Sequence, residues 1–216
     1  MTKSTTLLAY WKKYGILKEK KEINTMEKQT LVVATGNAHK LEEIAQIFTQ
    51  YCVVSQKQMS FDEDVEETGA TFAENALIKA RAATKALGLP TLADDSGLCV
   101  DALNGAPGVY SARYCGRHGD DAANRVLLLE NMKNESNRKA HFACAVALVY
   151  PDGKELLAEG KTFGEILHTE CGNGGFGYDS LFFNDDLQKS FGEATPEEKN
   201  SVSHRYRALQ ALLAKM

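Results

Sequence analysis

One segment, from Leu31 to Phe48, constrains what this chain can fold into more than any other. It reads LVVATGNAHKLEEIAQIF: an apolar run typical of a buried strand, a Thr-Gly-Asn break, and then apolar residues at helical spacing. A strand followed by a tight turn and a helix start directs free backbone N–H groups above the turn, and Lys40 adds a full positive charge there. The segment therefore predicts an α/β unit whose turn is either a phosphate site or an ordinary strand-to-helix connection.

Composition limits the size of the fold and the classes of partner. With 216 residues, of which 44% are hydrophobic, the chain can bury one sizeable core, so we expect a single folded domain. Its formal net charge of −4 gives no support for the basic surface that a nucleic-acid polymer requires, and it has no apolar run of the roughly 18 residues that cross a membrane. The five cysteines are dispersed without C-x-x-C spacing, which is typical of core thiols in a reducing compartment. We expect a cytoplasmic location.

Residues 1–29 differ in character from the rest of the chain. They hold a short apolar patch at residues 7–11, too short for a secretory signal, and then a run of lysine and glutamate. Met26 stands just before the first predicted strand, so we expect translation to begin there. The predicted organisation is a poorly ordered N-terminal leader over residues 1–29 and one folded domain over residues 30–216.

Strand patterns and one hairpin indicate a sheet. Short strands are predicted at residues 51–54, at 90–95, where the strand ends in two acids, and at 178–183. The apolar run 141–150 is followed by a Pro-Asp-Gly turn and a partner strand over 154–166, which predicts a long β-hairpin. Because helices are interleaved with these strands, we expect an α/β fold: a mixed β-sheet with a long hairpin, flanked by helices, in two lobes around a central cleft.

The helix signals are local. From Thr71 the pattern is helical, with Glu74 in the first turn and Gly88 at the stop, and its alanine stripe predicts close packing against another element. Residues 195–198 combine a cap residue, proline at the first helical position and glutamate three residues after the cap, and Ser203 begins the last helix. A further helix is predicted over residues 121–132, with these residues facing the core: Val126, Leu127, Leu129 and Met132.

Two adjacent acids at the end of an apolar strand are unusual, because like charges repel and burial of charge is costly. Successive side chains of a strand point to opposite faces, so one of Asp94 and Asp95 can enter a cleft while the other makes structural hydrogen bonds. Periodicity alone does not say which of the two enters the cleft.

Residues 172–177 match the G-x-G-x-x-G dinucleotide motif by letter but not by context. That motif follows a strand and opens a helix, whereas the residues that follow here are predicted as a strand. Two interpretations stay open. Either the glycines let the backbone approach a ligand, with Phe176 as a stacking face and Asp179 as an acceptor, or this is a plain loop that ends in a core phenylalanine.

The remaining polar residues indicate the class of ligand. The chain has neither a P-loop nor a G-x-S-x-G elbow, and its histidines lack metal-ligand spacing. Mg²⁺ prefers one or two carboxylates plus phosphate oxygens, and the candidate carboxylates are Glu67, Glu74, Asp94 and Asp95. The candidate anion binders are Lys40, Lys199, His204 and Arg205. This inventory suits a nucleoside phosphate.

Five stretches together resemble the inosine/xanthosine triphosphate pyrophosphatase family, which clears non-standard purine nucleotides. They are TGNAHK at 35–40, EETG and TFAENA within 66–76, LADDSGL through GAPGVYSARY within 92–114, GGFGYD at 174–179, and EEK with SHR within 197–205. The stretches occur in the family's order and cover nearly the whole chain from Leu31, so the set is far more specific than any one of them. Ser180 departs from the pattern, since many members carry proline there.

The resemblance implies a role for each matching residue. A cradle for the triphosphate is implied at Thr35, Gly36, Asn37, Ala38, His39 and Lys40. Glu67 and Asp95 are implied to hold Mg²⁺, and Asp95 also to act as the general base for water, which separates it from Asp94. Phe176 is implied to stack on the purine. The other implied contacts to base and phosphates are Ser96, Gly177, Tyr178, Asp179, Lys199, His204 and Arg205.

The resemblance further implies a homodimeric nucleoside triphosphate pyrophosphatase whose catalytic domain, residues 30–216, uses Mg²⁺ to hydrolyse dITP, ITP or XTP to the monophosphate and pyrophosphate. Donors at Arg205 or the His204 backbone would pair with O6 of the purine and meet a like donor at N6 of adenine, which rejects ATP. Two alternatives stay open: a pyrophosphatase of the related Maf type, acting on pyrimidine or modified nucleotides, and a nucleotide-binding regulator without turnover.

Overall fold

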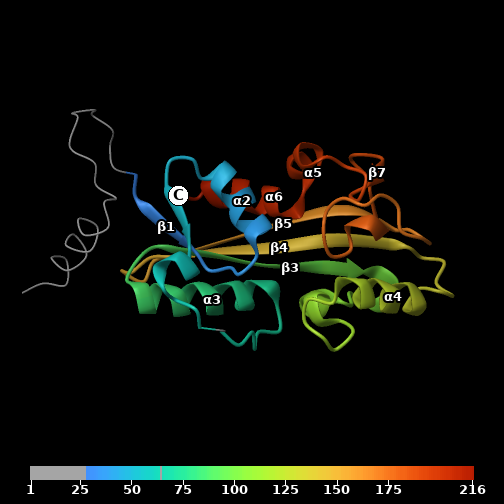
Figure 1. Cartoon of the computed structure of the whole chain (residues 1–216), viewed down its shortest axis with the longest axis horizontal. Coiled ribbons are helices and arrows are strands. Elements are labelled where there is room, and N and C mark those ends of the chain that lie inside the picture. The colour runs from blue at the N-terminus through green and yellow to red at the C-terminus, as the bar shows by residue number, and fades with distance from the viewer. Residues whose placement is uncertain (1–27, 64) are drawn as a thin grey trace, which may run out of the picture.

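A mixed sheet organises the chain in the computed structural model, which describes residues 28–63 and 65–216 (Figure 1). The strands are β1 (Thr30–Val33), β2 (Cys52–Ser55), β3 (Thr91–Val100), β4 (Lys139–Val149), β5 (Glu155–Ile166), β6 (Phe182–Asn184) and β7 (Lys189–Ser190). Over the described residues they lie in the order β2-β1-β3-β4-β5-β6-β7. β1 pairs in parallel with β2 and β3, and each later neighbouring pair is antiparallel.

Helices cover both faces of this sheet. They are α2 (Ala38–Ile47), α3 (Phe72–Leu87), α4 (Asp121–Asn131), α5 (Pro196–Val202) and α6 (His204–Leu213), with 3₁₀ turns η1 (Lys57–Met59), η2 (Asp101–Leu103), η3 (Gly108–Arg113) and η4 (Asp179–Leu181). α3 and α4 lie on one face, and α2, α5 and α6 lie on the other (Figure 1). Within the described ranges, none of the helices has the length and apolar character that crossing a membrane requires. The predicted α/β fold, with a mixed sheet flanked by helices, is confirmed.

The helix boundaries follow from short-range hydrogen bonds. In α3 the Glu74 amide donates to Thr71 Oγ1 at 3.2 Å and the Thr71 amide donates back to the Glu74 carboxylate at 3.1 Å. Gly88 ends that helix at φ 65°, a conformation that glycine adopts without steric cost. α5 begins with the same reciprocal cap at Thr195 and Glu198. Because each partner lies within a few residues of the other, the sequence predicts these boundaries correctly.

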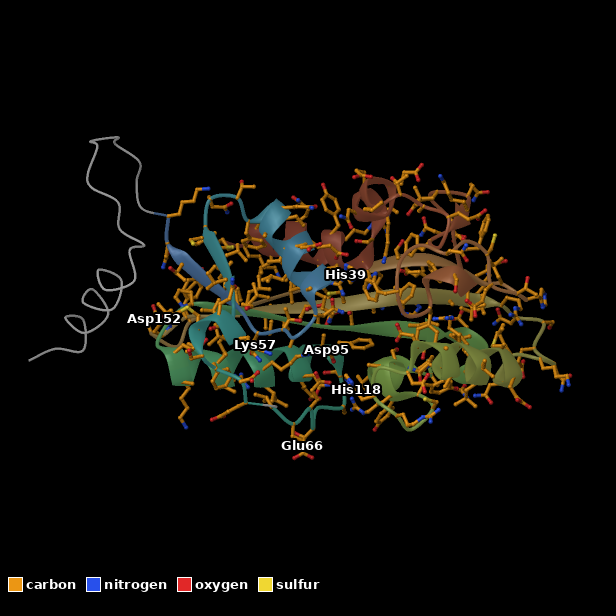
Figure 2. The ribbon with its side chains drawn as sticks, viewed as in Figure 1. His39, Lys57, Glu66, Asp95, His118 and Asp152 are labelled. Carbon is orange, nitrogen blue, oxygen red and sulfur yellow. The ribbon has the colours of Figure 1, made fainter. Side chains whose placement is uncertain are left out.

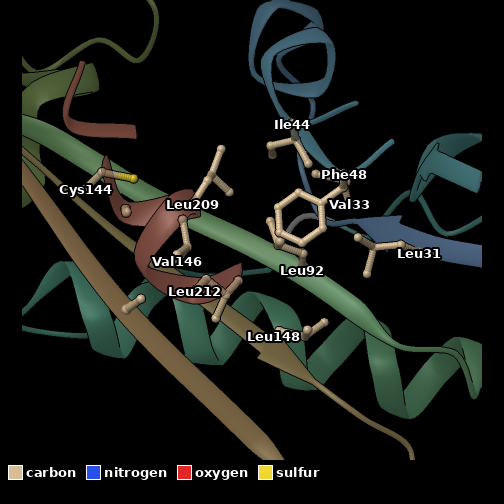
Figure 3. Packing of buried hydrophobic residues seen from close by; sticks show 12 residues of the cluster. Leu31, Val33, Ile44, Phe48, Leu92, Cys144, Val146, Leu148, Leu209 and Leu212 are labelled. Carbon is tan, nitrogen blue, oxygen red and sulfur yellow. The ribbon is translucent and has the colours of Figure 1, made fainter. Parts of the chain in front are cut away.

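Buried side chains form a layer on each side of the sheet. Figure 3 shows the layer between the sheet, α2 and α6, which includes Leu31, Val33, Ile44, Phe48, Leu92, Val146, Leu148, Leu209 and Leu212. On the opposite face, alanines of α3 pack against alanines of β3 and β4: Ala76, Ala80 and Ala83 against Ala93, Ala145 and Ala147. Small side chains let the α3 backbone approach the sheet closely, as the alanine stripe predicted. This close approach brings polar residues of α3 against β3.

β4 and β5 are antiparallel neighbours from Val149↔Glu155 to Lys139↔Glu165, and residues 150–154 join them. The joining turn is closed by the Tyr150 amide, which donates to the Lys154 carbonyl at 2.9 Å. The division of the domain into two lobes stays a prediction. So does the leader over residues 1–29, because residues 1–27 lie outside the described part of the chain.

Two predicted strands are wrong in extent. β3 does not end at the two acids, because it continues to Val100 along β4 and leaves Asp94 and Asp95 in mid-strand. Residues 179–181 form η4, so β6 begins only at Phe182. The chain curls there because the Leu181 amide donates to the Tyr178 carbonyl at 2.9 Å. The glycine loop leads directly into η4 and β6 and does not open an α-helix, so the context that the dinucleotide motif requires is missing here, as predicted.

The predicted inward face of α4 is also partly wrong. Val126 is 64% exposed, whereas Leu128 and Met132 are fully buried. Asn124, Leu128 and Met132 follow one another at four-residue spacing, so they form a single row on the helix. Asn124 heads this buried row because its Oδ1 accepts from the Cys115 amide at 2.8 Å. The buried face of α4 therefore includes a polar residue, Asn124, that anchors a loop, and the pattern of apolar residues did not predict this.

Candidate active site

One cavity of about 740 Å³ collects residues from segments that are far apart in the sequence. β1 pairs with β3 only at Thr91 and Leu92, because the chain leaves the sheet after β1 and continues into α2. The next part of β3 is therefore not covered by β1, and Asp95, Ser96 and Gly97 border the cavity there. The predicted site residues that line it are Thr35, Gly36, Asn37, His39, Lys40, Glu67, Asp95, Ser96, Phe176, Gly177, Tyr178, Asp179, Lys199, His204 and Arg205. Ala38 is not among the lining residues; it is exposed as the first residue of α2.

The turn before α2 has the predicted geometry, but its amides are partly occupied. Asn37 caps the helix, and its Oδ1 accepts from the amides of His39 and Lys40 at 2.9 and 3.3 Å. The Asn37 amide donates to Thr35 Oγ1 at 3.1 Å. The cap therefore uses two of the N–H groups that a helix start offers to an anion. Attraction for an anion at this turn comes mainly from the helix dipole and from Lys40.

Asp94 is the centre of a buried ion network. Its Oδ2 lies 2.9 Å from Lys40 Nζ and 3.1 Å from Arg205 Nε. Arg205, which is 1% exposed, also donates to Glu43 Oε2 at 2.7 Å and to Ser96 Oγ at 3.1 Å. Burial alone would raise the pKa of Asp94, but the charges of Lys40 and Arg205 outweigh it and hold that pKa far below its ordinary value. Asp94 therefore has the structural role, which the strand alternation left undecided.

Asp95 points to the other side of the sheet, toward α3 (Figure 2). Its Oδ2 accepts from Asn75 Nδ2 at 3.0 Å and its Oδ1 accepts from the Ser96 amide at 3.0 Å. Lys79 Nζ lies 3.6 Å from Asp95 Oδ1 and 2.7 Å from Glu67 Oε1. Asn75 and Lys79 are four residues apart on α3, so both reach the same strand. Asp95 is therefore held in a fixed orientation beside a cation and a second carboxylate.

The pKa values of the two carboxylates around Lys79, Asp95 and Glu67, are shifted in opposite directions. Burial raises the pKa of Asp95, and although Lys79 opposes this, the nearby charge of Glu67 adds to it. Burial also acts on Glu67, but the charges of Lys79 and Arg113 prevail and lower the pKa of Glu67. Asp95 is thus the better proton acceptor of the pair, and Glu67 is the more persistent anion.

The carboxylates fit a divalent cation at one place. Glu74 is occupied by the helix cap and Asp94 by the ion network, which leaves Glu67 and Asp95 facing the cavity. Among the described residues no group of three or more His, Cys, Asp or Glu side chains gathers as a metal site. Two carboxylates that share an ammonium are suited to Mg²⁺, which completes its shell with water and phosphate oxygens. The Lys79 ammonium shows that positive charge is stable between them.

The glycine loop presents Phe176 to the cavity. Asp179 Oδ2 accepts from the Phe176 amide at 2.8 Å and from Lys199 Nζ at 2.6 Å. The Lys199 ammonium lies 4.3 Å from the centre of the Phe176 ring, which is a favourable cation–π distance. Gly175 has φ 75°, and a Cβ there would lie 2.2 Å from the Asp179 carboxylate. Asp179 therefore acts first as the residue that holds the loop and its aromatic ring in place.

Gly177 and Tyr178 fasten this loop to the opposite wall. The Gly177 amide donates to Asp121 Oδ2 at 2.9 Å, and its carbonyl accepts from Arg125 Nη1 at 2.9 Å. The Tyr178 hydroxyl donates to the Ser111 carbonyl at 2.8 Å. Three hydrogen bonds to α4 and η3 therefore fix the position of Phe176 from the far side of the cavity.

His204 is a buried histidine whose Nδ1 atom has no hydrogen-bond partner among the residues that the structure describes. Its ring stacks on Phe142 with the centres 4.9 Å apart and the planes 14° apart. Burial and the charges of Arg205 and Lys199 hold the pKa of His204 well below its ordinary value, so the ring is neutral. An unpaired polar nitrogen in a cavity wall is a binding group for a ligand, because leaving it unpaired costs free energy.

Comparison with known proteins agrees with this geometry. A sequence model described as the Ham1 family matches residues 31–215.

The chain belongs to the Ham1 family.

Its Ham1 relatives include curated proteins named dITP/XTP pyrophosphatase. The one from Streptomyces coelicolor is 49% identical over 189 residues, which cover 85% of this chain and 94% of that protein. The one from Haemophilus influenzae is 47% identical over 195 residues, covering 88% and 100%. The solved structure of the Staphylococcus aureus Ham1 protein is 42% identical, with a TM-score of 0.81, covering 87% of this chain and 97% of that one. The family resemblance predicted from the sequence is confirmed.

Three polar residues that hold site residues in place were not predicted from the sequence: Lys79, which lines the cavity, Asn75, which donates to Asp95, and Glu43, which accepts from Arg205. A signal existed for two of them, since Asn75 and Lys79 are polar residues four apart on the otherwise alanine-rich buried face of α3. Glu43 had none, because its partner Arg205 lies 162 positions away in the chain. Only packing of α2 against the start of α6 brings that pair together.

His204 predicts a pH dependence of stability. Its folded pKa is depressed below the ordinary value of 6.5, so above that pH the ring is neutral in both states and folding carries no penalty. As the pH falls below 6.5, the unfolded chain binds a proton that the folded chain refuses, so the free energy of unfolding falls, by up to about 1.4 kcal/mol per pH unit.

We expect urea unfolding between about pH 5 and 7 to show this loss in the wild type and a reduced slope in His204→Gln. Glutamine keeps a polar side chain of similar length but does not titrate. Parallel stability curves for the two proteins would contradict the assignment of a buried neutral imidazole.

Proposed function

We propose that this Ham1-family enzyme hydrolyses the non-standard purine nucleoside triphosphates dITP, ITP and XTP to the monophosphate and pyrophosphate, and so cleanses the nucleotide pool. The observation that carries the proposal is one cavity that contains Glu67 and Asp95 beside Lys79, together with Lys40, Phe176 and His204. Such a cavity holds carboxylates for a metal, cations for phosphates and a ring for a base. The names of the curated relatives support two of these substrates, dITP and XTP.

Glu67 and Asp95 are the residues that would hold Mg²⁺, which would neutralise charge on the triphosphate oxygens when bound. Asp95 accepts the proton of the attacking water, since its raised pKa and its two anchoring hydrogen bonds suit a positioned base. Attack at the α-phosphorus breaks the bond between the α and β phosphates and releases pyrophosphate. Asn75 and the Ser96 amide keep the Asp95 carboxylate oriented through this step.

The triphosphate is bound by the turn before α2, by Lys40 and by Lys199. Lys40 and Lys199 are both paired with carboxylates, at 2.9 Å from Asp94 and 2.6 Å from Asp179. Phosphate binding therefore extends existing ion pairs, and the carboxylates keep the lysines in place when no substrate is bound. Lys79 supplies a third positive charge next to Glu67. Preorganised cations of this kind stabilise charge that develops on transferring phosphoryl groups.

The purine is recognised by Phe176 and His204. Arg205 already donates to Asp94, Glu43 and Ser96, so we assign the donor for purine O6 to His204, either through its unpaired ring nitrogen or through its amide. Adenine presents a donor at that position, and an unpaired buried polar clash discriminates by roughly 10⁴. The assignment favours hypoxanthine and xanthine over adenine.

The test is release of pyrophosphate from a panel of ITP, dITP, XTP, ATP, GTP, dTTP and UTP, each with Mg²⁺ and with EDTA. We expect release from the first three with Mg²⁺ and none with EDTA. Turnover confined to dTTP or UTP would favour the Maf-type alternative. Tight ITP binding without pyrophosphate release would favour a regulator.

We further propose that the enzyme acts as a cytoplasmic homodimer. All five cysteines are free thiols, which suits a reducing compartment. Light scattering of the purified protein should give twice the chain mass of 23.7 kDa. A monomeric mass would refute the dimer without touching the catalytic proposal.

A further inference from the structure

We propose that His39 recognises the purine base as a second aromatic plane facing Phe176, and does not belong to the triphosphate cradle. The inference rests on the proposed function, because it assumes a purine nucleotide as the substrate. It assigns a specificity role to one residue next to the turn that the proposed function gives to the triphosphate.

The orientation of the two rings carries the inference. The imidazole of His39 is parallel to the ring of Phe176 within 7°, and their centres lie 5.9 Å apart. Both side chains line the cavity. They come from segments far apart in the chain, since His39 is in the first turn of α2 (Figure 2) and Phe176 is in the glycine loop 137 positions later. Two parallel aromatic planes at a cavity are a geometry that can accept a flat ligand.

The two rings form a stacked pair, because 5.9 Å between the centres of parallel rings lies within the range of direct aromatic contact. A purine that enters between them needs van der Waals contact on both faces, so one of the two rings must move outward by about the thickness of a ring. Phe176 is held by Asp179, Lys199 and the anchors of Gly177. His39 is exposed, so its side chain can move by that amount without disturbing the core.

The direction of the next residue separates His39 from the phosphate site. Lys40 reaches inward to Asp94, where Nζ and Oδ2 are 2.9 Å apart. Successive residues of a helix point about 100° apart, so His39 and Lys40 do not serve the same group. Lys40 is turned toward the buried ion network and His39 toward the aromatic ring. The start of α2 therefore contributes to both ends of the substrate: the Lys40 ammonium at the triphosphate and the His39 ring at the purine.

Three variants of His39 test whether the residue contributes an aromatic ring or a positive charge. His39→Phe keeps an aromatic plane, His39→Lys keeps a cation, and His39→Ala keeps neither. Steady-state pyrophosphate release from ITP gives KM and kcat, and inorganic tripolyphosphate, used as a competitive inhibitor, reports the phosphate site alone. His168→Phe is the matched control, because His168 is exposed and is not among the lining residues of the cavity. Thermal unfolding of each variant checks that it is folded.

We expect His39→Ala and His39→Lys to raise KM for ITP about fivefold with kcat within about twofold of wild type, and His39→Phe to stay within about twofold in both. Inhibition by tripolyphosphate should be unchanged in all three. Retention by His39→Lys with loss in His39→Phe, equal loss in all three, no change in any of them, or weaker tripolyphosphate inhibition would each overturn the proposal. If the wild type releases no pyrophosphate from any purine nucleotide, the proposed function fails instead, so the two failures are distinct.

Discussion

We expect Asp95→Asn to lower kcat for pyrophosphate release from ITP by about 10³-fold, because it removes the proposed general base and one of the two carboxylates that would bind Mg²⁺. Asparagine has nearly the same shape, and its single amide oxygen can keep one of the two hydrogen bonds that Asp95 accepts from Asn75 and the Ser96 amide. We therefore expect the variant to fold and to retain ITP binding. Initial rates of pyrophosphate release, with calorimetric titration of ITP, measure the two effects separately.

The matched control for this variant is Asp152→Asn. Asp152 is exposed at the turn between β4 and β5 and lies away from Asp95 (Figure 2). Asp152→Asn removes one negative charge, as Asp95→Asn does, so any general effect of net charge appears in both variants. A kcat for Asp95→Asn within tenfold of the control would remove Asp95 from the role of base.

The second large effect is on stability. We expect Arg205→Met to lower the free energy of unfolding by about 3–5 kcal/mol, because it leaves the buried Asp94 and the part-buried Glu43 without their guanidinium partner. Methionine fills much of the same volume, so the loss reports the lost ion pairs more than a cavity, although Asp94 keeps Lys40 at 2.9 Å. In a chain of this size, that loss lowers the midpoint of thermal unfolding by roughly 10 °C. Urea and thermal unfolding provide the measurement.

Arg207→Met is the control within the same helix. Arg207 pairs with Asp186 at 2.7 Å, but its side chain is 39% exposed, and exposed pairs contribute at most about 1 kcal/mol. Combining Arg205→Met with Asp94→Asn should cost less than the sum of the two single changes, since the orphaned charge is gone. Equal losses for Arg205→Met and Arg207→Met would show that the buried network does not stabilise the fold.

The elements that the sequence predicted correctly depend on near neighbours. The caps at Thr71 and Thr195 and the glycine stop at Gly88 each involve residues within a few positions of one another. Apolar runs set the strands for the same reason, because alternation and helical spacing are local patterns. The fold class followed from the order of these elements, without any information on distant contacts.

The wrong predictions concern features that depend on a partner elsewhere in the chain. Whether β3 ends at Asp94 or continues is decided by β4, which pairs with it through Val100. Which face of α4 is inward is decided by Asn124, whose side chain holds a loop at Cys115. No pattern within a single segment reports such contacts.

By itself, the sequence determined the fold class, the helix boundaries, the family, and the residue types that gather around a nucleotide. Only the tertiary structure decided how their charges are matched: Lys40 and Arg205 to Asp94, Lys79 to Glu67 and Asp95, and Lys199 to Asp179. The physical reason is that an ion pair depends on distance and on burial. Both are set by how helices pack across a sheet, and neither is written in the spacing of residues along the chain.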